Sequence, residues 1–197
     1  MKKIILLLVL ISIASFGRMS YTDKVEFKIT ETFSKSYYQD KILKMCDFEH
    51  ESNFINLDDS VFKVMVTECD KYNLPYNMFF SLIDKESGFR SISNSTGSGA
   101  SGYMQLMPKT FQNFSRKLGL KGGNTPTNNI KAGAFYLSQI NKRWSHKYKS
   151  KKEVWIWTLA EYEAGLGGLQ VRDSTGVVLY HIPDECNSGI DKVMKNY

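Results

Sequence analysis

Histidine and cysteine are scarce in this 197-residue chain, and their spacing excludes the chemistry that they most often support. The three histidines are scattered and match no zinc-binding spacing such as His-Glu-x-x-His, so we expect no metal site. The three cysteines stand in no known nucleophile motif. One pair of them can join in an oxidising compartment, but the sequence does not say which pair. These residues are His50, His146, His181, Cys46, Cys69 and Cys186.

An apolar run of membrane-spanning length is also missing. The run Ile4–Ile13 has about ten residues, whereas a spanning helix needs about 20. It follows Met1-Lys2-Lys3 and precedes small residues, which is the pattern of a signal peptide over residues 1–17, cleaved after Gly17 or Ala14. The short run disfavours the alternative of an uncleaved anchor, and no cysteine follows closely enough for a lipid anchor. We therefore expect export to the periplasm or the exterior, with no stable membrane span in the mature chain.

Basic runs with interleaved aromatic residues are absent, although the net charge of the whole chain is +6. Such runs are typical of nucleic-acid binding, so we expect no nucleic-acid partner. Loss of the signal peptide removes two lysines and still leaves a basic protein, which suits an anionic surface such as a cell wall. Internal repeats and low-complexity tracts are missing too, and 42% hydrophobic residues is a globular composition.

Helical spacing of apolar residues dominates the chain after residue 57. A helix-start signal, Asp58-Asp59-Ser60, precedes the first pattern, and one later strand is indicated at 177–180. The sequence therefore predicts an all-α fold with at most a short strand pair, in a single domain over 58–197. The expected helices cover 61–72, 76–87, 108–118, 128–143 and 154–164, and the inward residues of the fourth are Ile130, Ala134, Leu137 and Ile140.

Residues 18–57 form an N-terminal extension that stands apart from these patterns. Val25–Ile29 alternates like a strand, and 36–49 is expected to be a helix with Tyr37, Ile42 and Met45 pointing inward. The extension is a pro-like segment, a partner-binding arm or a strap across the domain. The strap is the interpretation that we favour.

Glu86 is the main candidate for chemistry. It ends an apolar helix that carries Phe79, Leu82 and Ile83 on the same face, and Gly88 is a suitable stop. A carboxyl group placed there is partly desolvated, so its pKa should rise, as a general acid near neutral pH requires. A Ser-, Gly- and Asn-rich loop follows, and then Gly102 and Gln105, which allow close backbone approach and amide hydrogen bonding. One acid beside an amide-lined groove suits a sugar polymer.

Four blocks of sequence carry a family resemblance. In order along the chain they are Glu86-Ser87, 102–108 (Gly-Tyr-Met-Gln-Leu-Met-Pro), 129–137 and 160–165. Together they resemble the soluble lytic transglycosylases, a group in the superfamily of goose-type lysozyme, over about 61–197. The resemblance implies a lysozyme-like fold, a closing helix over about 182–197, and no metal or organic cofactor. It also implies peptidoglycan glycan strands as substrate, cut between N-acetylmuramic acid and N-acetylglucosamine by a glycan lyase that leaves 1,6-anhydro ends.

The resemblance assigns roles to particular residues. Glu86 would be the single acid and then base, whereas its plain alternative is an ordinary helix-end glutamate. Ser87 would bind substrate or orient Glu86, and Gly102, Met104 and Gln105 would line the groove. Met104 and Ser87 have ordinary packing and helix-end alternatives, and the Tyr162 hydroxyl, expected near Glu86, has the alternative of a core aromatic residue.

Two departures from the family pattern matter. Glu163 stands where the family usually has asparagine in Ala-x-Tyr-Asn-Ala-Gly. A second carboxylate there would raise the pKa of Glu86 further, or would position a water and favour plain hydrolysis. Ile190 falls where the closing helix usually carries a tyrosine near the site.

The main prediction is an exported peptidoglycan lytic transglycosylase. The first alternative is a goose-type-lysozyme-like hydrolase of the same bond, which would also use Glu86. The second is a peptidoglycan-binding or assembly module with a weakened site, motivated by Glu163 and Ile190. Small family members often serve secretion, conjugation or phage assembly machines, so such a machine is the expected partner.

Overall fold

The computed structural model describes residues 34–93, 97, 99–172 and 174–197. The expected signal peptide over 1–17 and the expected strand Val25–Ile29 lie outside these residues. The described helices are α3 (Lys35–Leu43), α4 (Glu51–Ile55), α5 (Asp59–Tyr72), α6 (Tyr76–Ser87), α7 (Pro108–Lys117), α8 (Pro126–Ser145), α9 (Lys151–Gly168) and α10 (Asp184–Met194). The described strands are β1 (Gln170–Arg172) and β2 (Val178–Tyr180). The predicted all-α fold with a short strand pair is confirmed.

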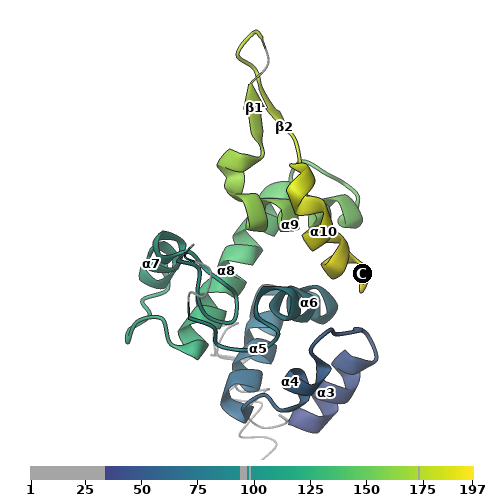
Figure 1. Cartoon of the computed structure of the whole chain (residues 1–197), viewed down its shortest axis with the longest axis vertical. Coiled ribbons are helices and arrows are strands. Elements are labelled where there is room, and N and C mark those ends of the chain that lie inside the picture. Colours follow the sequence, from purple (N-terminus) through teal and green to yellow (C-terminus); the bar gives the residue numbers. More distant parts are fainter. Residues whose placement is uncertain (1–33, 94–96, 98, 173) are drawn as a thin grey trace, which may run out of the picture.

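Helix α8 lies at the centre of the arrangement. It packs against α5, α7 and α9, and α10 closes the structure by packing on both α6 and α9. In Figure 1, α3 to α6 lie below and to the right of α8, α7 lies to its left, and α9, α10 and the hairpin lie above. The predicted inward residues of α8, Ile130, Ala134, Leu137 and Ile140, are all fully buried.

Capping side chains fix where several helices begin. The Asp58 carboxylate accepts hydrogen bonds from the backbone N–H groups of Ser60 and Val61. Thr125 and Ser150 cap α8 and α9 in the same way. These side chains satisfy backbone donors that have no partner within the first helical turn. The helix-start signal at Asp58–Ser60 is therefore confirmed.

The part of the N-terminal extension that the structure describes contributes to the core. Phe54 of α4 is fully buried, and its ring centroid lies 4.9 to 5.8 Å from four other phenylalanine rings. The four rings come from the extension, α5, α6 and the turn that follows α6, and they belong to Phe48, Phe62, Phe80 and Phe89. Residues 34–57 therefore share one hydrophobic cluster with the rest of the described chain.

The predicted burial within this extension is partly wrong. Ile42 is buried as expected, but Tyr37 is 62% exposed and Met45 is 40% exposed. The helix ends at Leu43, not at residue 49, so Met45 lies in the turn that follows and is not held on the helical face. Tyr37 packs edge-on against Tyr38 at the surface, with ring centroids 5.3 Å apart.

Strands β1 and β2 form an antiparallel hairpin that projects from the α9 and α10 side (Figure 1). Only β2 was indicated by the sequence. All three cysteines lie within the described ranges, where they are free buried thiols and no pair of them is joined. Within the described part of the chain, no helix has both the length and the apolar character needed to cross a bilayer. No cluster of three or more metal-ligating side chains occurs among the same residues.

Candidate active site

Glu86 lies in the last turn of α6, at the wall of a cleft of about 480 Å³. The helix is anchored because Phe79, Leu82 and Ile83, which precede Glu86 on the same helical face, are buried. Gly88 ends the helix in a left-handed conformation with φ 55°, which a glycine adopts without strain. The cleft is lined by Lys85, Glu86, Ala100, Gln105, Leu106, Met107, Thr110, Tyr136, Tyr162, Glu163, Ala164 and Gly165.

Burial dominates the electrostatics of Glu86, whose side chain is only 15% exposed. Desolvation raises the pKa of the Glu86 carboxyl, the nearby Lys85 ammonium opposes this effect, and the negative charge of Glu163 adds to it. The net result is a pKa above the usual glutamate range. Glu86 is therefore suited to carry a proton at a higher pH than an exposed glutamate would.

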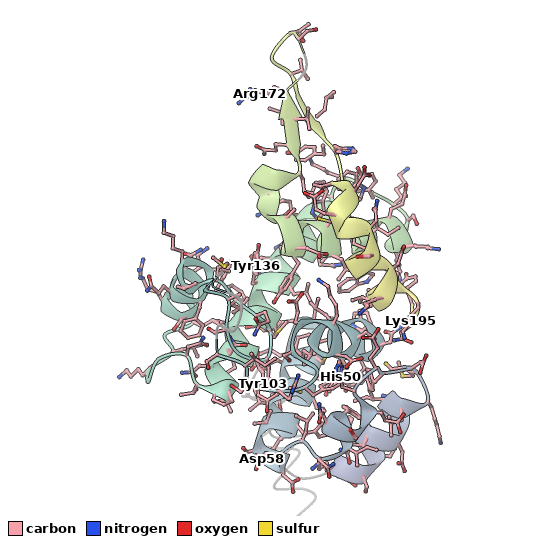
Figure 2. The ribbon with its side chains drawn as sticks, viewed as in Figure 1. His50, Asp58, Tyr103, Tyr136, Arg172 and Lys195 are labelled. Atoms are coloured by element: carbon pink, nitrogen blue, oxygen red, sulfur yellow. The ribbon has the colours of Figure 1, made fainter. Side chains whose placement is uncertain are left out.

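Helix α9 supplies a second wall. The Tyr162 hydroxyl donates a hydrogen bond to the Met104 carbonyl oxygen at 2.7 Å, and its ring centroid lies 5.4 Å from that of Tyr136 on α8. Figure 2 shows Tyr136 at the part of α8 that lies between α7 and α9. Burial, with the nearby Glu86 charge, raises the pKa of Tyr162 well above its usual value. Tyr162 therefore stays neutral and ties the loop before α7 to α9.

The loop before α7 is built around a buried amide. The Asn129 Oδ1 atom accepts a hydrogen bond from the Met104 N–H at 2.8 Å, and Asn129 Nδ2 donates to the Ser101 carbonyl oxygen at 3.0 Å. A Cβ atom at Gly102 would lie 2.3 Å from the Asn129 amide carbon, so only glycine fits there. Gln105 turns back with φ 42°, and its Nε2 donates to the Gly102 carbonyl oxygen at 2.8 Å. These bonds hold Gln105 at the edge of the cleft.

The structure brings together four of the seven predicted site residues. Glu86, Gln105, Tyr162 and Glu163 line the cleft. The other three, Ser87, Gly102 and Met104, are buried and do not line it.

Each of these three has a packing contact instead. The Ser87 hydroxyl donates to the Ile83 carbonyl oxygen at 3.1 Å, within its own helix. Met104 packs so closely on Gly133 that a Cβ at that glycine would lie 2.4 Å from the Met104 sulfur. These contacts fit the plain packing alternatives for Ser87 and Met104. Ile190 is also buried and lies outside the lining of the cleft.

Lys85 and Tyr136 are among the lining residues to which sequence reasoning gave no role in the site. The Lys85 ammonium lies 3.1 Å from Glu86 Oε1 and 3.2 Å from Glu163 Oε1. Neighbouring residues on a helix do not normally face each other, so no spacing rule would have joined Lys85 to Glu86. The one available signal was the unusual Glu163, a charge that needs a partner when it is partly buried.

The helical frame and the shielded Glu86 carboxyl group with its raised pKa in a cleft are features suited to acid–base chemistry on a bound molecule. Comparison with known families gives the particular group. The family described as "Transglycosylase SLT domain" matches residues 64–175, which is more than half of the chain. The chain belongs to this family.

A solved structure shows the same fold. It is the X-ray structure of an inactive glutamate-to-glutamine mutant of the lytic transglycosylase Slt from Pseudomonas aeruginosa. The two share 24% sequence identity with a TM-score of 0.52, and the match covers 91% of this chain. This chain spans only 30% of the length of the Pseudomonas protein.

Proposed function

We propose that this chain is a peptidoglycan lytic transglycosylase that cleaves the β-1,4 bond between N-acetylmuramic acid and N-acetylglucosamine. The observation that carries the proposal is the position of Glu86, a shielded carboxyl with a raised pKa in the wall of the cleft. Family membership supports the substrate class. The inactive mutant of the Pseudomonas relative, in which one glutamate became glutamine, supports a central role for one carboxyl group.

Glu86 has two successive tasks in the proposed reaction. The protonated carboxyl donates its proton to the glycosidic oxygen as the bond from that oxygen to C1 of the muramic sugar breaks. The carbonyl oxygen of the sugar's own N-acetyl group bonds to C1 and stabilises the positive charge. The Glu86 carboxylate then takes the proton of the C6 hydroxyl, O6 bonds to C1, and the acetamido oxygen leaves. Glu86 ends protonated, and no water is consumed.

Glu163 bears on the hydrolytic alternative, because it is the second carboxylate in the lining of the cleft. In most glycosidases a second carboxylate acts as nucleophile or activates water. Here Glu163 is ion-paired with Lys85, which favours a structural use of its charge. We therefore place hydrolysis second.

Mass spectrometry of muropeptides released from purified peptidoglycan tests the proposal. The wild type should release products lighter by one water, about 18 mass units, than those of a hydrolase. Glu86→Gln should lower the rate by about 10³-fold, because proton transfer is lost while the shape of the side chain is kept. Glu51→Gln, an exposed change on α4 away from the cleft, is the control and should keep full activity.

Two other results would reject this function. Reducing-end products from the wild type would indicate a hydrolase. No products from the wild type, together with binding of peptidoglycan, would indicate the binding or assembly module.

The proposal includes export and a role at the cell wall. The apolar run at 4–13 after two lysines supports export, as does a substrate that lies outside the cytoplasm. A chain lacking residues 1–17 should stay in the cytoplasmic fraction, and equal distribution of the two forms would reject this part. Service to a secretion, conjugation or phage assembly machine is the proposed context, to be tested by whether deletion of the gene blocks such a machine without affecting growth.

A further inference from the structure

Lys85 lies between the two carboxylates of the cleft. Its ammonium nitrogen is 3.1 Å from Glu86 Oε1 and 3.2 Å from Glu163 Oε1, so it bridges α6 and α9. The lysine side chain is only 18% exposed, and that of Glu163 is 29% exposed. A charge pair this well shielded interacts more strongly than a pair at the open surface.

Helix α10 leaves room for this pair. At Gly189 an added Cβ would lie 2.6 Å from Glu163 Oε2 and 2.7 Å from Lys85 Cε. Glycine within a helix costs about 1 kcal/mol relative to alanine, so its presence here calls for a local reason. The bridge between Lys85 and Glu163 supplies that reason, because it occupies the space that a side chain at this position would need.

The bridge divides the charge of one lysine between two acids. Burial alone would lower the pKa of Lys85, but Glu86 and Glu163 outweigh burial and raise it, so the ammonium stays charged. Glu49, Asp84, Lys192 and Lys195 line a small pocket together with Lys85, but the charges that shift the pKa of Glu86 are those of Lys85 and Glu163. Three further titratable groups near the bridge are Tyr162 on α9, Tyr136 on α8 and Cys186 on α10. Burial raises the pKa of each of the three, so all are neutral at pH 7 and leave Lys85 and Glu163 as the charges that act on Glu86.

We propose that Lys85 and Glu163 are a positioning pair for Glu86: Lys85 holds the Glu86 carboxyl, and Glu163 holds Lys85 and limits how strongly it acts. This inference rests on the proposed function and deepens it. It gives a purpose to the glutamate at position 163, where the family pattern has an amide. It also means that Glu163 is a fixed counter-charge and takes no part in delivering water.

Opposite shifts of the pH–rate profile test the pair. Activity should fall as pH rises through the pKa of Glu86, because the proton donor is lost. Lys85→Met removes the cation that favours ionised Glu86, so this alkaline limb should move up by about one pH unit. Glu163→Gln leaves Lys85 wholly to Glu86, so the limb should move down by a similar amount. Lys85→Arg, which keeps the charge, should restore most of the wild-type profile.

Glu153→Gln is the matched control for the loss of one negative charge. It lies at the exposed start of the same helix, α9, and should leave the profile unchanged. In the Lys85→Met background, Glu163→Gln should move the limb much less than it does alone, since most of its effect passes through the lysine. If Lys85 and Glu163 had only a structural role, both single variants would lower the rate, and the alkaline limb of the pH–rate profile would stay in place in each.

Gly189→Ala tests the packing of the pair without removing a charge. Both neighbours of the new methyl group are flexible side-chain ends, so the protein should stay folded while the pair is displaced. The rate should fall about tenfold, because small misplacements of a catalytic group are costly. Gly167→Ala is the control, since a Cβ there would meet nothing within 4 Å, and it should keep the wild-type rate.

The outcomes separate this inference from the proposed function. If the wild type forms anhydro products but Lys85→Met and Glu163→Gln leave the alkaline limb in place, the positioning pair is rejected and the transglycosylase stands. If Glu163→Gln converts reducing-end products into anhydro products, Glu163 delivers water and the pair is also rejected. If the wild type forms no products, the proposed function itself fails.

Discussion

At the scale of single residues, the acid role proposed for Glu86 and the stability of the fold make opposite demands on its environment. Burial keeps its proton in place, as a general acid requires, but the same burial makes the ionised form costly. Because the folded-state pKa lies above that of the unfolded chain, the folded state binds more protons between these two values. The contribution of the protonated Glu86 carboxyl to stability is therefore fully present below the pKa of the unfolded chain, and it is lost as pH rises through the pKa of the folded state.

The first prediction at this scale concerns Glu86→Gln, which removes the ionisation and keeps the shape. The variant should have a higher melting temperature than the wild type at pH 8, and this advantage should vanish near pH 4, where the wild-type carboxyl is protonated too. Thermal unfolding followed by circular dichroism at both pH values measures the difference, with Glu51→Gln as the exposed control. An advantage of equal size at both pH values would mean that ionisation of Glu86 is not its cause.

The candidate site could be predicted from sequence only where local pattern decides the position. Glu86 followed from its place at the end of an apolar helix, and Gln105 from its motif. Lys85 could not be recognised, since its partner Glu163 comes from a helix 78 positions later in the chain and only the packing of α6, α9 and α10 joins them. For Ser87 the sequence left two roles open, and in the structure its hydroxyl donates to the Ile83 carbonyl oxygen of its own helix.

At the scale of elements, α6 is held at its carboxyl end by the N-terminal extension. The Asp84 carboxylate accepts hydrogen bonds from the Glu49 N–H at 2.8 Å and from His50 Nδ1 at 2.8 Å. Asn53 Nδ2 donates to the Gly88 carbonyl oxygen at 2.9 Å, which caps the end of the helix. Figure 2 shows His50 beside α6, at the side where α4 approaches. These bonds fix the turn of helix that carries Glu86.

The second prediction compares two glycines that end helices with similar positive φ, Gly88 at 55° and Gly119 at 65°. Gly119→Ala should cost about 1 to 2 kcal/mol for the left-handed backbone alone, since a Cβ there meets nothing within 4 Å. Gly88→Ala should cost about 1 to 3 kcal/mol more, because its Cβ would lie 2.8 Å from the His50 ring, which is bonded to Asp84. Urea unfolding measures both, and equal losses would show that the His50 contact is unimportant.

The positions of most helices were more predictable from the sequence than the tertiary contacts that these helices make. The caps and apolar spacing gave α5, α6, α8 and α9 because each is a local property of the chain. The extension was misjudged where burial depends on distant partners, since Ile42 meets the core whereas Tyr37 on the same helix faces outward. Strand β1 was missed for a similar reason, because its three exposed residues gain strand structure only by pairing with β2.

At the scale of the whole molecule, the extension and α6, which carries Glu86, share one core. Phe54 of α4 packs at the meeting point of rings from α5, α6 and the turn after α6. The described part of the extension therefore does more than lie across the surface as a strap. We therefore expect the folding unit to begin well before residue 58, so that loss of a core contact in α4 affects the whole domain.

The third prediction tests this directly with two adjacent residues of α4. Phe54→Ala should lower the free energy of unfolding by about 3 to 5 kcal/mol, because it leaves a cavity among four rings in a fully buried site. Ile55→Ala, at a position that is 45% exposed, should cost less than about 1 kcal/mol. Urea unfolding should be followed by two signals, circular dichroism for all helices and fluorescence from the tryptophans of α8 and α9. In Phe54→Ala both signals should shift together to lower urea, because one cooperative core is weakened. If only a small part of the circular dichroism signal shifts to lower urea and the tryptophan fluorescence does not, the extension unfolds on its own and the domain begins after it.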